Sequence, residues 1–385
     1  MDILKEGLFF AEKVLKSSAR PTGFFASGLP GGYAALWARD SMITSLGASI
    51  LGTKFKKPFA KSIALLSKNE SHLGQIPNAV GTYNTDRRSN VTFNSIDSTL
   101  WYIIGHHVYR ASYNDSSLFK KYKKNLEKAF IWLTYQDPNE DTLLVQQPTM
   151  DWQDAFPHKY GRTINTQALY YAVLCMMGYA KKAEHLKNVV NGVTGKYLSL
   201  FDAGRGYYLP WVWKNHDGDR EEEHWFDTLG NLLAIVTGLA SPKIASSILN
   251  YIEKGRVNRP YPAKAIWPPL KKGDKEWHSY FAKSDARTPH HYLNAGVWPF
   301  IGGFYVVALV KMKKFSQAKK ELELLAKANK KVKSGLAIKG WGFHEWLHGK
   351  RGLPIGNSNP YQAWSAGAYI YAYRCFEMKK VLYFK

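Results

Sequence analysis

The chain has 385 residues, of which 45% are hydrophobic and 15% aromatic, and its formal net charge is +23. A chain with this much apolar content can bury a large core, which excludes disorder as its main state. No apolar run is long enough to cross a membrane. The opening residues Met1–Glu6 carry acids where a signal peptide has a basic flank. We therefore expect a cytoplasmic protein.

The excess of basic residues first suggests a nucleic-acid or anionic-surface partner. Many lysines, however, share one helical stretch with regularly spaced leucines, which is typical of the wet face of an amphipathic helix. These lysines are Lys311, Lys313, Lys314, Lys319, Lys320, Lys327, Lys330, Lys331 and Lys333. We therefore expect no nucleic-acid partner.

Apolar residues recur at helical spacing in segment after segment, so the pattern predicts an all-α protein. The predicted helices span 2–17, 38–51, 56–68, 96–113, 116–135, 163–180, 182–200, 226–239, 242–254, 294–312, 315–330 and 361–378. Strand signals are confined to 142–147 and 207–213. Because strands and helices do not alternate, a Rossmann fold and a TIM barrel are both disfavoured.

The predicted helices come in tandem pairs, which favours an α-solenoid or a closed double ring of helices. No repeat of 33 to 47 residues is present, so common helical arrays are disfavoured. Long loops are predicted at 19–37, 69–95, 136–162, 205–225, 255–293 and 331–360. Loops of this length are usually functional, and in a closed ring they would gather at one end. No linker divides the chain, so we predict one domain over 1–385.

Two loop segments carry acids beside tryptophans. Cleavage of a glycosidic bond requires two carboxyl groups: one protonates the leaving oxygen, and the other activates water or attacks the sugar. The first segment contains Asp151, Trp152 and Asp154, and the second contains Glu345. An acid against indole surface tends to have a raised pKa, as a general acid needs. The alternatives are ordinary ones: loop solvation and helix capping for the two aspartates, and backbone hydrogen bonding for the glutamate.

Other polar and aromatic residues at predicted helix starts could bind a sugar. They could equally be caps, ion pairs or core residues. These residues are Trp37, Arg39, Asp40, Asp97, Trp101, Asn294, Trp298, Gln362 and Trp364. The two cysteines are far apart, and adjacent histidines do not face one way on a helix, so we expect no metal site. No phosphate-binding glycine loop is present, and we expect no cofactor.

Taken in order, these segments resemble the neutral/alkaline invertases of glycoside hydrolase family 100, within the wider group of (α/α)6-barrel glycosidases that includes amylo-1,6-glucosidase domains. The likeness runs over roughly 33–375. Its clearest stretch, 226–242, resembles the family's Phe-x-Thr-Leu-Gly-Asn-Leu segment, and 294–299 resembles Asn-Gly-Gly-x-Trp-Pro. The resemblance implies an (α/α)6 barrel with its active site in the loops.

The resemblance also implies roles for single residues. The family has an Asp thirteen positions before a Gln-Ala-Leu helix start, and Asp154 lies thirteen before Gln167. It therefore implies Asp154 as general acid, Glu345 as the partner carboxylate, and Asp151 as a neighbour that binds a hydroxyl or tunes a pKa. Sugar-binding roles are expected for Trp152, Gln167 and His344 as well.

The chain departs from the invertase pattern at Ala155, Phe156 and Asn165, which replace two arginines and a glutamate. We therefore predict a glycoside hydrolase that cleaves small α-glucosidic substrates by an inverting, two-carboxylate mechanism, and sucrose is not its expected substrate. The alternatives are an amylo-α-1,6-glucosidase, a sugar epimerase that uses histidines as proton shuttles, and a basic helical scaffold without activity. The oligomeric state is left open.

Overall fold

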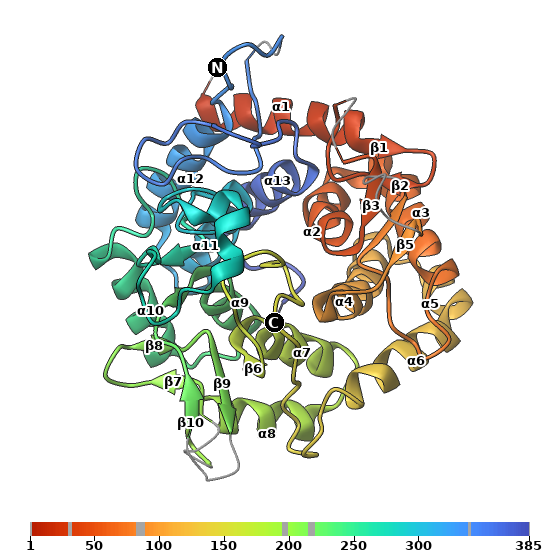
Figure 1. The fold of residues 1–385 in the computed structure, drawn as a ribbon. Coiled ribbons are helices and arrows are strands. Elements are labelled where there is room, and N and C mark those ends of the chain that lie inside the picture. Colours follow the sequence, from red (N-terminus) through yellow and green to blue (C-terminus); the bar gives the residue numbers. More distant parts are fainter. Residues whose placement is uncertain are drawn as a thin grey trace.

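Helices of the chain alternate between an inner and an outer ring around one axis (Figure 1). The computed structural model describes residues 2–29, 33–81, 89–194, 199–214, 220–337 and 340–384. The inner ring consists of α2 (Ala38–Ala48), α4 (Ile96–Tyr113), α7 (Ile164–Met176), α9 (Thr228–Thr237), α11 (Pro299–Lys311) and α13 (Ala363–Glu377). The outer ring consists of α1 (Ile3–Ser18), α3 (Lys56–Lys68), α5 (Ser117–Lys121), α6 (Lys123–Thr134), α8 (Ala180–Val190), α10 (Pro242–Lys254) and α12 (Phe315–Asn329).

The inner ring is closed, because each inner helix contacts the next and α13 returns to contact α2. The contact between α13 and α2 needs glycine on both sides. A Cβ on Gly47 would stand 2.1 Å from the carbonyl oxygen of Gly367, so a larger residue would push the two helices apart. This closure makes the fold an (α/α)6 barrel, as the sequence predicts.

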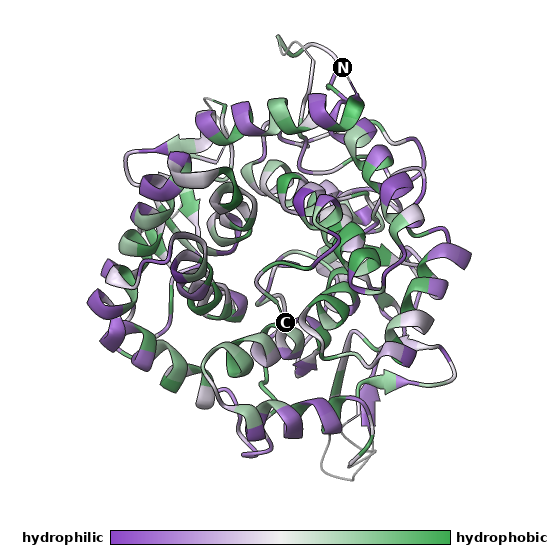
Figure 2. Cartoon of the chain, turned by 180° about the vertical axis from the view of Figure 1, so that it is seen from behind, coloured by the Kyte–Doolittle hydropathy of each residue, from purple (hydrophilic) through white to green (hydrophobic). Residues whose placement is uncertain are grey.

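The burial pattern of the two rings follows from their position. Every residue of α11 from Pro299 to Val310 is buried, because an inner helix has protein on all sides. In α10, by contrast, only one stripe is buried, and its members are Ile244, Ala245, Ile248, Leu249 and Ile252. Polar residues accordingly gather on the outside of the outer helices (Figure 2). On α12 the predicted wet face is confirmed, since Lys319, Lys320 and Lys327 are exposed.

The two ends of the barrel have connections of very different length. At one end, an inner helix passes to its outer partner within a few residues, as at 177–179 and 312–314. At the other end, the long segments 19–37, 69–95, 135–163, 191–227, 255–298 and 330–362 lead back into the inner ring. The expectation that the long loops gather at one end is confirmed.

Short antiparallel strands brace these long loops. Three-stranded sheets are formed by β3 (Ala35–Trp37), β4 (Ala79–Gly81) and β5 (Val91–Thr92), and by β10 (Arg220–Glu222), β9 (Trp211–Lys214) and β6 (Arg162–Thr163). Two-stranded pairs are β1 (Ala19–Arg20) with β2 (Gly23–Phe24), β7 (Phe201–Asp202) with β8 (Tyr207–Tyr208), and β11 (Phe226–Asp227) with β12 (Ile266–Trp267). Because β3, β6 and β11 run directly into α2, α7 and α9, these pairings fix where the inner helices begin.

Several predicted boundaries are wrong for identifiable reasons. Segment 142–147 forms one isolated bridge, between Gln146 and Gly161, instead of a strand. The predicted helix 182–200 ends at Val190, shortly before Gly192 with its φ of +75°. The predicted helix 294–312 begins only at Pro299, because Ala295 has a φ of +62°.

The other differences are smaller. The predicted helix 116–135 is interrupted at Tyr122, and the stretch after Ala48 is the 3-10 helix η1 (Ser49–Phe55). Pro210 separates β8 from β9 where one strand was predicted. No helix among the described residues is long and apolar enough to cross a bilayer.

Candidate active site

Asp154 and Glu345, far apart in sequence, come together at the long-loop end of the barrel. Asp154 lies in the loop before α7, and Glu345 lies in the loop before α13. The negative charges of both carboxylates raise the pKa of the same two tyrosines, Tyr33 and Tyr292, above the ordinary value for a phenol. Tyr33 also donates a hydrogen bond of 3.3 Å to Oε1 of Glu345.

A cavity of about 260 Å³ opens over Glu345. Its lining is largely polar and consists of Tyr33, Lys283, Asp285, Tyr292, Glu345, Trp346 and Asn357. Polar groups that converge on a small cavity are what a compact hydroxylated ligand requires. The cavity therefore has the size and chemistry to hold a sugar ring at the carboxyl group of Glu345.

The surroundings raise the pKa of both carboxyl groups. Asp154 is reached by solvent, but protein displaces much of its water, and this desolvation raises its pKa to about 6, while Arg39 opposes the rise. Glu345 is 6% exposed. Its burial raises its pKa to about 8, with a further contribution from the charge of Asp40. Both groups can therefore exchange protons near neutral pH, as acid–base catalysis requires.

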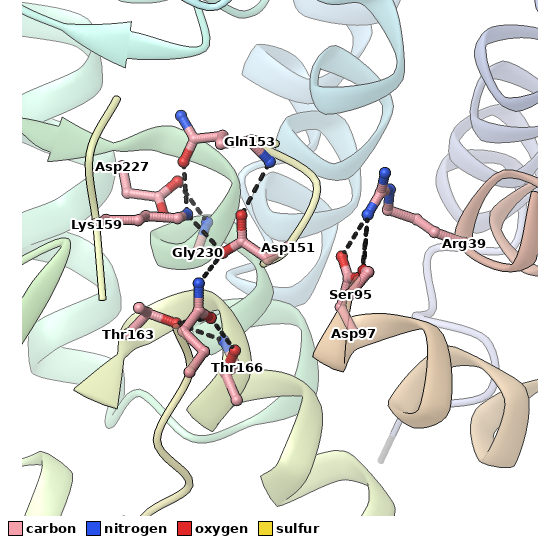
Figure 3. Close-up of polar contacts among 11 residues, drawn as sticks. Arg39, Ser95, Asp97, Asp151, Gln153, Lys159, Thr163, Thr166, Asp227 and Gly230 are labelled. Atoms are coloured by element: carbon pink, nitrogen blue, oxygen red, sulfur yellow. Dashed lines mark hydrogen bonds and ion pairs between the residues drawn. The ribbon is translucent and has the colours of Figure 1, made fainter. Parts of the chain in front are cut away.

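A buried ion pair stands beside these carboxyls. Nη1 of Arg39, in the first turn of α2, donates to both carboxylate oxygens of Asp97, in the first turn of α4, at 2.9 Å each (Figure 3). Ser95 also donates to Asp97. Desolvation raises the pKa of Asp40 to about 6, although the adjacent Arg39 opposes the rise. The pair joins two inner helices and places one positive charge among several carboxyls.

Lys159 holds the loop that carries Asp154. Its ammonium group is fully buried and contacts Oδ2 of Asp151 at 2.8 Å and Oδ2 of Asp227 at 3.1 Å (Figure 3). It also donates to Oε1 of Gln153 at 2.5 Å. Asp227 caps the start of α9 by accepting from the backbone N–H of Gly230. Through Lys159, the loop that carries Asp154 is therefore tied to the start of the inner helix α9.

Asp151 is fixed by further contacts. Its Oδ1 accepts from the backbone N–H of Gln153 at 2.9 Å, and its Oδ2 accepts from Nε2 of Gln146 at 3.3 Å. Gln146 in turn accepts from the hydroxyls of Thr163 and Thr166 at the start of α7. Asp151 thus anchors the loop, while Asp154 is the carboxyl exposed to solvent.

The predicted tryptophans form the aromatic floor of this end of the barrel. Trp152 packs edge-on against Trp298 at 5.5 Å between ring centroids, and Trp364 stacks on Phe300 at 4.2 Å. Trp37 packs against Tyr33 at 6.0 Å. Side-chain polar atoms of this region lack a hydrogen-bond partner among the described residues, and they are Nε1 of Trp152 and Trp364 and both amide atoms of Gln362. Buried groups of this kind in proteins are usually satisfied by ordered water or a bound group.

Four residues predicted to bind sugar are engaged elsewhere. Trp101 is buried against Phe304, and the amide of Gln167 bonds in both directions to the backbone of Leu144. The amide of Asn294 bonds to the backbone of Leu270 and Ala286. The ring of His344 accepts from the N–H of Lys333 and lies against Ser358. Their contacts are those of residues that support the site.

Comparison with known proteins adds the family. The family described as amylo-alpha-1,6-glucosidase matches residues 16–371, which is most of the chain. The chain belongs to this family. The family is one of glycoside hydrolases, in agreement with a carboxyl pair at the loop end of an (α/α)6 barrel.

Curated relatives of this family member are plant invertases. Alkaline/neutral invertase E of Arabidopsis thaliana is 29% identical over 200 residues, which is 50% of this chain and 30% of the invertase. Neutral/alkaline invertase 3 of Oryza sativa is 33% identical over 150 residues, or 38% of this chain and 23% of the invertase. The match thus covers less than a third of the length of either relative.

Solved structures share the fold of the family member at low identity. A wild-type glycosidase has a TM-score of 0.66 at 13% identity and covers 98% of each chain. A GH63 mannosylglycerate hydrolase from Thermus thermophilus, in complex with Tris and D-glycerate, has a TM-score of 0.67 at 13% identity and covers 94% of this chain and 99% of its own. These likenesses establish the barrel.

Sequence reasoning missed several residues of the site. Tyr33, Tyr292, Lys283 and Asp285 line the cavity over Glu345, but they belong to the long connections between outer and inner helices, whose course the sequence does not specify. Lys159 was missed because a lysine in a loop is usually exposed. The one available signal was its position five residues after Asp154, within a segment already rich in acids.

Proposed function

We propose that this chain hydrolyses an α-glucosidic bond with Asp154 and Glu345 as its two catalytic carboxyl groups. The observation that carries the proposal is that two carboxyls 191 positions apart in the sequence lie close enough for the charge of Asp154 to raise the pKa of Glu345. Both pKa values are raised from their ordinary range, and Glu345 lines a small polar cavity. Membership of the amylo-alpha-1,6-glucosidase family supports the same reaction class.

In the proposed reaction, Asp154 donates its proton to the glycosidic oxygen as the bond from that oxygen to the anomeric carbon breaks. Glu345 accepts a proton from water, whose oxygen bonds to the anomeric carbon from the opposite face. The product is a sugar of inverted anomeric configuration, as expected for an acid and base that act through one water molecule. Proton transfer of this kind contributes about 10²–10⁴-fold to the rate.

The pKa values bear on which carboxyl is the acid. In the ligand-free site Glu345 has the higher pKa, so it holds a proton more readily than Asp154. The roles proposed above follow the family resemblance. They can be tested with α-glucosyl fluoride, whose fluoride leaves without being protonated, so the variant that lacks the general acid should still hydrolyse it. If Glu345→Gln still releases fluoride and Asp154→Asn does not, then Glu345 is the general acid and Asp154 the base.

The substrate proposed is a glucose unit released from an α-linked oligosaccharide, with an α-1,6 bond favoured by the family match. Sucrose is disfavoured, because Phe156 is buried against Phe281 at 4.6 Å, where the invertase pattern has an arginine. The test is a screen of the purified chain against sucrose, isomaltose, panose, maltose and mannosylglycerate, with the anomer of the product followed by NMR. Cleavage of sucrose alone would overturn the preference.

The epimerase alternative receives less support. It needs two histidines as proton shuttles, yet the ring of His344 is bonded on both sides to Lys333 and Ser358. The cytoplasmic location and the single domain over 1–385 stay predictions.

A further inference from the structure

A line of partly exposed aromatic rings runs along the outside of the loop that carries Asp154. We call it the aromatic ridge and define it as Tyr280, His278, His158, Tyr160 and Trp213. His158 and His278 stack at 4.2 Å between centroids with an interplanar angle of 20°, and Nδ1 of His158 is 2.9 Å from Oη of Tyr280. Tyr160 continues the line, 5.6 Å from His158 and 6.4 Å from Trp213.

The ridge is accessible. Tyr280 is 41% exposed, and the other four side chains are half-buried, because each ring covers part of its neighbour. Beneath it, buried Trp211 packs under Tyr160 at 4.4 Å and supports the line from below. The ridge thus offers a firm surface of ring faces and edges instead of scattered side chains.

The ridge adjoins the catalytic cavity. Tyr280 belongs to the 3-10 helix η3 (Ser279–Lys283), whose last residue, Lys283, lines the cavity with Glu345. A 3-10 helix rises about 2 Å per residue, so the backbone of Tyr280 lies about 6 Å along the helix from that of Lys283. At the other side, His158 follows Asp154 by four residues.

The chemistry of the ridge fits a neutral ligand. Desolvation lowers the pKa of His158, with the neighbouring His278 adding to the effect, so its ring is uncharged at neutral pH. Uncharged aromatic faces stack on apolar ring faces, such as those of glucose. An acceptor for hydroxyl groups lies alongside, since exposed Glu221 accepts from Tyr160.

We propose that the aromatic ridge binds the part of an α-linked glucan chain that extends beyond the bond to be cleaved. This inference rests on the proposed function for its choice of sugar. It makes a chain of several glucose units a better ligand than a disaccharide, because the ridge lies outside the cavity that holds the first sugar.

The test measures binding without turnover. In the Asp154→Asn background, the affinity for maltoheptaose and for glucose is measured by calorimetry. We expect maltoheptaose to bind more tightly than glucose, and Tyr280→Ala and Trp213→Ala each to weaken maltoheptaose binding about three- to tenfold, which corresponds to one aromatic contact. Tyr179→Ala is the matched control, because Tyr179 is also 41% exposed but lies between α7 and α8, at the end of the barrel opposite the ridge. It should leave the affinity unchanged.

Each outcome is decisive. Equal affinity of maltoheptaose for the Asp154→Asn protein with and without the ridge substitutions would overturn the ridge, as would equal binding of maltoheptaose and glucose. Trp213→Ala probes the far end of the ridge independently, should Tyr280→Ala fail to fold. Hydrolysis by the wild-type chain is measured separately on isomaltose and panose. If the wild-type protein hydrolyses neither sugar but still binds maltoheptaose, the proposed function is rejected and the proposal for the ridge is not.

Discussion

The two ends of the barrel differ in the volume of their cavities and in the residues that line them. At the short-connection end a cavity of about 950 Å³ is lined mainly by small and apolar residues such as Val108, Ala172 and Met176. At the long-loop end the cavity over Glu345 is about 260 Å³, yet it is lined by charged and polar side chains, among them the buried carboxyl of Glu345. The difference teaches that the proposed site is indicated by neighbouring carboxyls with raised pKa values, and not by cavity volume.

Removal of either proposed catalytic carboxyl is expected to have the largest effect on the long-loop end. Asp154→Asn and Glu345→Gln should each lower kcat on the best substrate about 10²–10⁴-fold, since each removes a proton transfer from the transition state. Initial rates measure the effect, and circular dichroism checks the fold. Glu184→Gln, an exposed glutamate lining the opposite cavity, is the control and should keep wild-type rates. Near-normal turnover in either site variant would refute the assignment.

Replacement of Lys159 tests the buried charges of the loop end. Lys159→Met leaves Asp151 and Asp227 buried without their shared cation. Breaking a buried ion pair by removal of one partner costs about 3–5 kcal/mol, so the free energy of unfolding in urea should fall by that order. Lys182→Met, on exposed α8, is the matched control and should change it by less than about 0.5 kcal/mol. A small effect at Lys159 would mean that the loop is held by other contacts.

The pH dependence of stability should differ between the two ends. The folded-state pKa of Glu345 is about 8, above its ordinary value of 4.5, so between these pH values the folded chain holds a proton that the unfolded chain releases. The folded state therefore loses stability as pH rises through this window. Glu345→Gln removes this loss, so its Tm advantage over wild type should grow from pH 5 to pH 8. A constant Tm difference between Glu345→Gln and wild type across this pH range would contradict the raised pKa of Glu345.

The smallest expected effect concerns the phenol that touches Glu345. The hydrogen bond from Tyr33 lowers the pKa of Glu345. Tyr33→Phe should therefore move the pH–rate limb that belongs to Glu345 upward by less than about one unit, the equivalent of one hydrogen bond. A pH profile of kcat/KM measures the shift. A profile that stays in place, or moves to lower pH, would show that the phenol does not stabilise the carboxylate.

Local sequence accounts for most of the helices. The bounds of α3, α4 and α10 agree with the predicted ranges, because regular apolar spacing and clear stops such as Gly255 act within a few residues. Prediction failed where a single backbone residue decides the outcome. The positive φ of Ala295 delays the start of α11, and the interruption at Tyr122 divides one predicted helix into α5 and α6.

The sequence by itself determined the all-α class, the paired helices and the long loops, because these follow from periodicity and residue types. The choice of Asp154 and Glu345 follows from the family resemblance and stays a prediction. Only the tertiary structure decided how those loops meet. It placed Tyr33 and Tyr292 beside both carboxyls and buried Lys159 between Asp151 and Asp227. The physical reason is that closure of the inner ring brings distant segments to one end, where burial and neighbouring charge, which no local pattern encodes, set the pKa values.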